Sequence, residues 1–163
     1  MLRKLFPHPG LTVLLTGVWL LMLNSVSVGG LVVAVLLGTI IPIFTAPFWP
    51  DRPPLRFGWP IVDYLLVVTG DIVVANFHVA GIILFRRNRD LRSRWLTVPL
   101  ELRSTEAITM LAGTISLTPG TVSSDVSADG RFLLVHALDV ADEAAEVARI
   151  KQRYEARLQR IFR

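Results

Sequence analysis

Three titratable side chains interrupt an apolar segment and are the first candidates for chemistry. Asp63, Asp71 and His78 lie between Ile61 and Phe85, whose other residues are mostly apolar or small. At about 100° per residue, a helix places the three within roughly 80° of one another. Ionisable groups inside a membrane are costly and often act as proton relays or ion ligands. A proton relay is therefore one hypothesis. The alternative, which we favour, is that they mark the face of the helix turned towards water or a protein partner.

The segment from Leu117 to Thr121 is the most specific local sequence. Thr118 is disfavoured in the helical region because it precedes Pro119, and Gly120 can adopt a positive φ. The hydroxyl groups of Thr118 and Thr121 can satisfy backbone groups that the ending helix leaves free. The sequence therefore predicts a helix stop followed by a turn. We interpret it first as turn chemistry, with a docking corner against a partner as the functional alternative.

The remaining reactive side chains form no recognisable catalytic pattern. The chain has no cysteine, which excludes disulfides and thiolate chemistry. His136 has no second histidine or carboxylate at ligand spacing, so we expect no metal site. Ser116, Ser123 and Ser124 lack the Gly-x-Ser-x-Gly context of a hydrolase, and there is no phosphate-binding glycine loop. We therefore expect neither an enzyme nor a cofactor.

These candidates follow a long apolar region at the start of the chain. No charged residue occurs from Leu11 to Pro50, and one helical crossing of a bilayer needs about 20 apolar residues. Asparagine, serine and glycine cluster between Asn24 and Gly30, in the middle of this run. The pattern predicts a membrane protein that begins with a transmembrane hairpin in residues 1–60, with spans at about 11–28 and 29–49.

Positive charge gathers directly after the third apolar segment. The cluster consists of Arg86, Arg87, Arg89, Arg92 and Arg94. This is the placement of a cytoplasmic membrane anchor, and it puts the C-terminal part of the chain in the cytoplasm. The net charge of +4 arises largely from this cluster, so we expect no nucleic-acid partner.

The third apolar helix, in residues 61–94 with its basic anchor, leaves two topologies open. If all three segments cross, Arg3 and Lys4 face the outside, against the positive-inside rule. If only two cross, the third helix lies at the inner interface. Its length and apolarity favour crossing, whereas the charge distribution favours two crossings, which is the model we prefer.

The pattern of residues 95–163 predicts a small water-facing domain. Alternating apolar residues from Leu96 predict an edge strand, and Ser104 or Thr105 can cap the following helix. Two further strands are joined at Asp129-Gly130, a strong hairpin signal, and the third has apolar residues on both faces, as a central strand does. Asp139 or Asp142 can cap the last helix. The order βαββα predicts a cytoplasmic α+β domain, ferredoxin-like in outline.

Two of these stretches carry a resemblance to a known family. The segments Ile115–Thr121 and Leu134–Asp139, the latter followed by an acidic-capped helix with Tyr154, resemble the E subunit of the multisubunit Mrp-type (Mnh/Pha) sodium/proton antiporter of bacteria. The uncharged double span agrees with this. The family's motif is carried over onto Thr118, Pro119 and Gly120.

The resemblance implies an accessory subunit of a cation/proton antiporter in the bacterial cell membrane. Its partners would be the other antiporter subunits and the lipid bilayer, with the main ion paths in the larger subunits. The second hypothesis is a membrane-anchored sensor or adaptor whose cytoplasmic domain binds a regulator.

Overall fold

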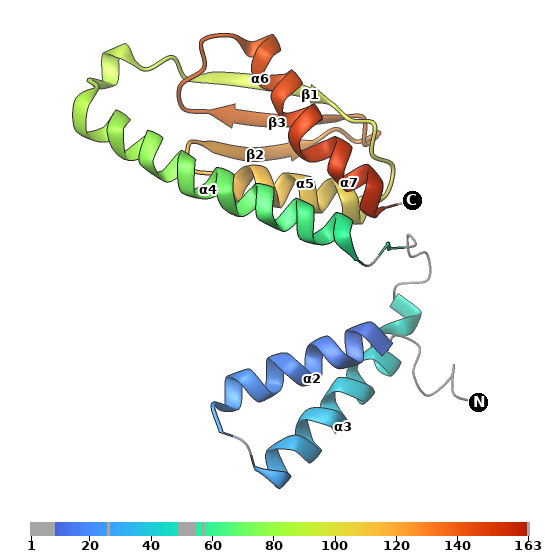
Figure 1. Ribbon diagram of the computed structural model, residues 1–163. Coiled ribbons are helices and arrows are strands. Elements are labelled where there is room, and N and C mark those ends of the chain that lie inside the picture. Colours follow the sequence, from blue (N-terminus) through green and yellow to red (C-terminus); the bar gives the residue numbers. More distant parts are fainter. Residues whose placement is uncertain (1–8, 26, 49–54, 57, 163) are drawn as a thin grey trace. The chain divides into compact units, whose positions relative to one another are not determined.

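The computed structural model describes residues 9–25, 27–48, 55–56 and 58–162 and consists of two compact units, Met1–Arg52 and Pro53–Arg163 (Figure 1). Arg3 and Lys4, on which the topology argument drew, lie outside the described residues, as does the end of the second predicted span. The third apolar helix belongs to the same unit as the C-terminal α+β domain.

The first unit is a helical hairpin of α2 (Pro9–Leu23) and α3 (Val28–Thr45), and the 3-10 turn η1 (Ala46–Phe48) continues α3. Ser27 caps α3 by accepting a hydrogen bond from the backbone N–H of Gly30 at 3.0 Å. Most large apolar side chains of both helices point outward; Leu21, for example, is 81% exposed. A soluble domain does not leave this much apolar surface uncovered, but a lipid environment covers it.

Length and composition agree with membrane insertion. The stretch Val28–Phe48, of 21 residues, and helix α4, Trp59–Phe85, of 27 residues, are each long and apolar enough to cross a bilayer. Helix α2 is apolar but has 15 residues, which makes it shorter than the predicted span at 11–28. The prediction of a membrane protein with apolar helices is thereby supported, and the order of the first two helices is as expected.

Gly38 lets the two helices of the hairpin approach closely. A Cβ atom at this position would lie 2.3 Å from Thr16 Oγ1 and 3.0 Å from the carbonyl oxygen of Thr12. The hydroxyl of Thr16 also donates to the carbonyl of Ala34 across the hairpin, at 3.4 Å. A residue without a side chain is therefore needed at position 38, because α2 packs directly against it. Small residues have the same role in other closely packed pairs of membrane helices.

Replacing Gly38 with Val is expected to destabilise the hairpin by about 1–2 kcal/mol, because the added atoms overlap the backbone and Thr16 of α2. Thermal unfolding of the purified chain in mild detergent measures the loss. Gly17→Val is the matched control, since a Cβ at Gly17 meets nothing within 4 Å. Equal midpoints for the two variants would contradict this packing.

The second unit places a three-stranded antiparallel sheet against helices. In chain order it contains α4, the 3-10 turn η2 (Asn88–Asp90), β1 (Arg94–Pro99), α5 (Thr105–Leu117), β2 (Thr121–Val126) and β3 (Phe132–Ala137). One continuous helical stretch follows, made of α6 (Glu143–Ile150), the π-helical turn η3 (Lys151–Glu155) and α7 (Ala156–Ile161). The sheet order is β1-β3-β2, so β3 is central, as its sequence predicted.

The helix caps follow the sequence signals. Ser104 caps α5 through the N–H of Ala107 at 3.2 Å, and Asp142 caps α6 through the N–H groups of Ala144 and Ala145. The alternative cap, Asp139, binds arginine side chains instead. Of the two capping candidates for each helix, the residue directly before the first helical turn is the one used.

One face of the sheet carries the core of this unit. The inward side chains of β1 and β3 meet apolar residues of α5, of the last helical stretch and of α4. The largest fully buried apolar side chains of this core are Leu96, Val98, Leu133, Val135, Leu111, Ile115, Ile150, Tyr154, Leu158, Ile161 and Tyr64. The other face of β3 is only partly covered: Phe132 is 44% exposed. Helix α4 thus contributes to the core of the domain that follows it.

Candidate functional site

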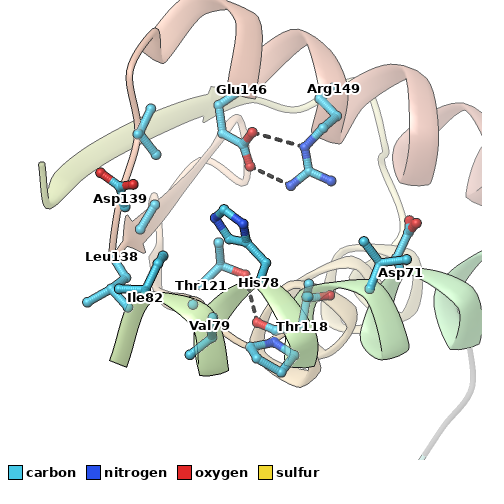
Figure 2. A pocket seen from close by; sticks show the side chains of 16 residues that line it. Asp71, His78, Val79, Ile82, Thr118, Thr121, Leu138, Asp139, Glu146 and Arg149 are labelled. Carbon is cyan, nitrogen blue, oxygen red and sulfur yellow. Dashed lines mark hydrogen bonds and ion pairs between the residues drawn. The ribbon is translucent and has the colours of Figure 1, made fainter. Parts of the chain in front are cut away.

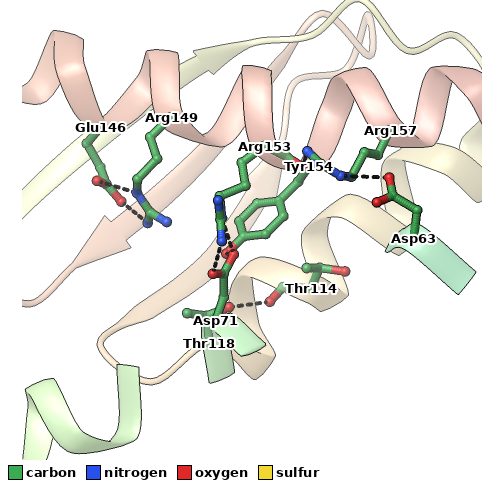
Figure 3. Close-up of polar contacts among 9 residues, drawn as sticks. All are labelled: Asp63, Asp71, Thr114, Thr118, Glu146, Arg149, Arg153, Tyr154 and Arg157. Carbon is green, nitrogen blue, oxygen red and sulfur yellow. Dashed lines mark hydrogen bonds and ion pairs between the residues drawn. The ribbon is translucent and has the colours of Figure 1, made fainter. Parts of the chain in front are cut away.

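Two of the three candidate residues of α4, Asp63 and Asp71, bind the last helical stretch. The carboxylate of Asp71 accepts hydrogen bonds from Nε and Nη2 of Arg153, both at 2.5 Å, and from the Tyr154 hydroxyl at 3.0 Å (Figure 3). The carboxylate of Asp63 accepts from Nε of Arg157 at 3.1 Å. Both acids therefore face a protein surface of the same chain. The partner that these two acids contact is a helix of their own chain.

His78, the third of these residues, lies apart from the two ion pairs. Figure 2 shows its ring in a pocket, pointing towards the pair formed by Glu146 and Arg149. In that pair, Nε of Arg149 donates to a carboxylate oxygen of Glu146 at 2.9 Å. Asp71 also lines this pocket, whereas Asp63 does not, so the structure brings two of the three residues to one pocket.

The pocket has a volume of about 240 Å³ and lies where α4, the turn after α5, the end of β3 and α6 meet. Its floor is apolar, with Val79, Ile82 and Pro119 among the lining residues, and charged residues including Asp71 and Glu146 also line it. Within the described residues there is no group of three or more histidine, aspartate or glutamate side chains that could hold a metal ion.

The turn from Thr118 to Thr121 closes α5 with the predicted chemistry. The Thr118 hydroxyl donates to the carbonyl of Thr114 at 3.0 Å, and the Thr121 hydroxyl to the carbonyls of Ile115 and Thr118 at 2.7 and 3.0 Å. Gly120 has a φ of 90°. A Cβ on Gly120 would lie 3.1 Å from a methyl carbon of Val79, so the turn also packs against α4. The corner therefore docks a helix of its own chain.

Gly120→Ala is expected to destabilise the chain by about 1–2 kcal/mol, because alanine is strained at this φ and its methyl group meets Val79. Thermal unfolding in detergent tests this. Gly113→Ala serves as the control: Gly113 lies inside α5 with open space around its Cβ position, so alanine there should be neutral or stabilising. A neutral Gly120→Ala would show that the turn does not depend on glycine.

A buried pair of hydroxyl groups also joins α4 to α5. The hydroxyl groups of Tyr64 on α4 and Thr114 on α5 form a hydrogen bond, and Thr114 also donates to the carbonyl of Met110 at 2.8 Å. Tyr64 is only 1% exposed. Helix α4 is thus attached to both α5 and the last helical stretch.

Three arginines of the cluster after α4 form ion pairs with acidic residues of the domain. Arg86 forms an ion pair with Asp139, which also pairs with Arg92 at 3.5 Å, and Arg94 lies 3.7 Å from Glu143. Burial alone would raise the pKa of Asp139. The backbone N–H of Arg92 and the charges of Arg86 and Arg92 outweigh that effect and hold the pKa below its ordinary value. This carboxylate therefore adds stability above a pH of about 4, which is lost at lower pH as it becomes protonated.

Sequence reasoning identified the acids of α4 but missed their partners. Arg153, Tyr154 and Arg157 bind the two acids and were not singled out for these contacts. One signal was available: the arginines at positions 149, 153 and 157 are four residues apart, which aligns them on one side of a helix. That basic stripe matches the acidic stripe of α4.

Comparison with known proteins places this architecture in a family. Residues 12–161 match the family model described as "Na+/H+ ion antiporter subunit". The chain is 33% identical over 161 residues to a probable E subunit of a K⁺/H⁺ antiporter of Rhizobium meliloti, and the match covers 99% of each chain. It is 28% identical over 153 residues to the E subunit of a Na⁺/H⁺ antiporter of Bacillus subtilis, covering 94% of this chain and 96% of that one.

The chain belongs to the Na⁺/H⁺ ion antiporter subunit family, and the resemblance inferred from its motifs is confirmed. It also shares its fold with a chain of the membrane-bound sulfane sulfur reductase, an archaeal respiratory membrane complex. That match has a TM-score of 0.76 at 24% identity and covers 99% of this chain and 100% of the other.

Proposed function

We propose that the chain is an accessory subunit of a multisubunit monovalent cation/proton antiporter, needed for assembly and activity but separate from the main ion path. Family membership over residues 12–161 supports the first part. The observation that carries the second part is that Asp71 and Asp63 are held by Arg153 and Arg157. The bonds from Arg153 hold the pKa of Asp71 below its ordinary value, and a carboxylate kept ionised in this way is a poor carrier of protons.

Relatives are named for sodium and for potassium, so we leave the cation of this complex as monovalent. A sensor or adaptor is the competing function. Affinity capture of the tagged chain from native membranes in mild detergent, followed by mass spectrometry, separates the two. Several large membrane proteins in fixed ratio are expected with the chain. Recovery of the chain alone, or with a soluble regulator, would contradict the antiporter proposal.

We also propose a topology of two crossings by the α2–α3 hairpin, with the α+β domain in the cytoplasm. Support comes from the absence of charge between Leu11 and Pro50 and from the exposed side chains of Arg87 and Arg89 after α4. The chain has no cysteine, so a single cysteine at exposed Thr97 reports the side of the domain. A membrane-impermeant maleimide should label it in inside-out vesicles and not in intact cells.

The domain topology supports a ferredoxin-like outline. Strands β1 and β2 each pair antiparallel with β3, which lies between them, and α5 connects β1 to β2. Two parallel strands separated by an antiparallel one form the split βαβ arrangement of that fold. We propose that the domain is a ferredoxin-like unit with three strands.

A further inference from the structure

The exposed side of α4 is a broad apolar face, with Leu65, Val74, Ile83 and Phe85 on its flanks. One stripe runs along the centre of this face. Its members are Trp59, Leu66, Val73, Phe77 and Leu84, which are 51–77% exposed. At about 100° per residue they lie within roughly 40° of one another on the helix. The buried residues of α4, Tyr64, Val68 and Ile82, lie on the opposite side. We call the exposed set the outer stripe.

The domain contacts one side of α4 along almost its whole length. Near its start, Tyr64 bonds Thr114, and just past its end Arg86 pairs with Asp139. Between these points lie the Asp71–Arg153 pair and the contact of Val79 with the turn. The 22 steps from residue 64 to residue 86 span about 33 Å of helix, which is more than the hydrocarbon thickness of a bilayer. No part of α4 long enough to cross is free of the domain.

Crossing would therefore carry the domain into lipid. Strands β1 and β2 are the edges of the sheet, and Arg153 has a side chain that is 45% exposed. Unpaired strand edges and exposed charges are not tolerated in hydrocarbon. The domain must remain in water, and α4 remains with it.

We propose that α4 lies in the plane of the membrane surface, with its outer stripe inserted among the lipids and its inner face holding the α+β domain. The outer stripe contacts the bilayer, because only residues 49–58 of the chain separate α4 from Val28–Phe48, an apolar stretch long enough to cross it. Exposed Arg87 and Arg89 follow the helix, where anionic headgroups would attract them. Interfacial helices of this kind bury their apolar face by about 5–10 Å.

This inference rests on the proposed membrane subunit but can fail separately from it. Single cysteines replace Leu66, Val73, Phe77 and Leu84 in the cysteine-free chain, carry a nitroxide spin label, and are studied in the assembled complex in lipid nanodiscs. Collision with oxygen and with a water-soluble nickel complex gives the depth of each label. Leu36, exposed in the middle of α3, is the deep control, and Thr97 on β1 is the aqueous control.

The four labels are expected at one shallow depth, between the two controls. They span about 27 Å along the helix, so a crossing α4 would place Val73 and Phe77 deeper than Leu66 and Leu84 by roughly 10 Å. That profile would overturn the inference. So would protection of all four labels from both reagents, which would mean that a protein covers the stripe. Recovery of the complex by affinity capture remains the separate test of the proposed function.

Discussion

Replacing Glu155 with Ala is expected to lower the free energy of unfolding by about 3–4 kcal/mol. Glu155 lies in η3 and is 1% exposed, and one of its carboxylate oxygens accepts from the backbone N–H groups of Glu101 and Leu102 at 2.6 and 3.2 Å. The other oxygen pairs with Lys151 at 3.1 Å. Alanine removes the acceptor of both N–H groups, and the loss of each such acceptor costs about 1–3 kcal/mol. It also removes one partner of Lys151, which keeps its ion pair with Glu101 at 2.8 Å and its bond to the Pro99 carbonyl at 3.0 Å.

Denaturant or thermal unfolding of the purified chain measures this loss. Glu155→Gln is the informative second variant, because its amide oxygen can still accept from the two N–H groups; we expect it to keep more than half of the stability that Ala loses. Glu143→Ala is the surface control, since Glu143 is 55% exposed and its ion pair with Arg94 is long. Equal losses for Glu155→Ala and Glu143→Ala would contradict the account.

The Asp71–Arg153 clamp gives the second large effect. Asp71→Asn is expected to cost about 2–3 kcal/mol, because the two charge-assisted bonds from Arg153 and the bond from Tyr154 lose their anionic acceptor. The Arg153 side chain is 45% exposed, which keeps the value below that of a fully buried pair. The loss appears as weaker attachment of α4 to the domain.

A double-mutant cycle tests whether the pair acts together. Unfolding is measured for Asp71→Asn, Arg153→Gln and the double variant. A coupling energy of about 1–2 kcal/mol is expected, since the two side chains bind each other at two points. Asp63→Asn is the comparison: its single bond to Arg157 is 3.1 Å long, so its cost should be smaller. Additive effects of Asp71→Asn and Arg153→Gln would mean that the two residues act independently.

Local features of this chain were predictable from the sequence because their causes are local. The caps at Ser104 and Asp142 and the positive φ of Gly120 each depend on a few neighbouring residues. The central position of β3 followed from apolar residues on both its faces. The helix order of the hairpin followed from the uncharged run.

The placement of α4 could not be predicted in the same way. Its high apolarity resembles that of a membrane span, yet the helix has two apolar sides: Tyr64, Val68 and Ile82 pack into the domain core, and Phe77 and Leu84 are exposed. Hydropathy sums both sides and cannot separate them. The polar stripe of Asp63 and Asp71 was visible, but its arginine partners are more than 80 residues away along the chain. Long-range pairing of this kind is set by the tertiary fold.

The central claim is that this subunit supports a cation/proton antiporter without carrying its main ion path. The most direct measurement is proton-coupled cation transport in inside-out membrane vesicles, divided by the amount of assembled complex, for Asp63→Asn, Asp71→Asn and His78→Gln, singly and combined. The account predicts less assembled complex for Asp71→Asn but nearly unchanged transport per complex in every variant. Normal assembly with a large loss of transport per complex would contradict it and would assign these residues to the proton path.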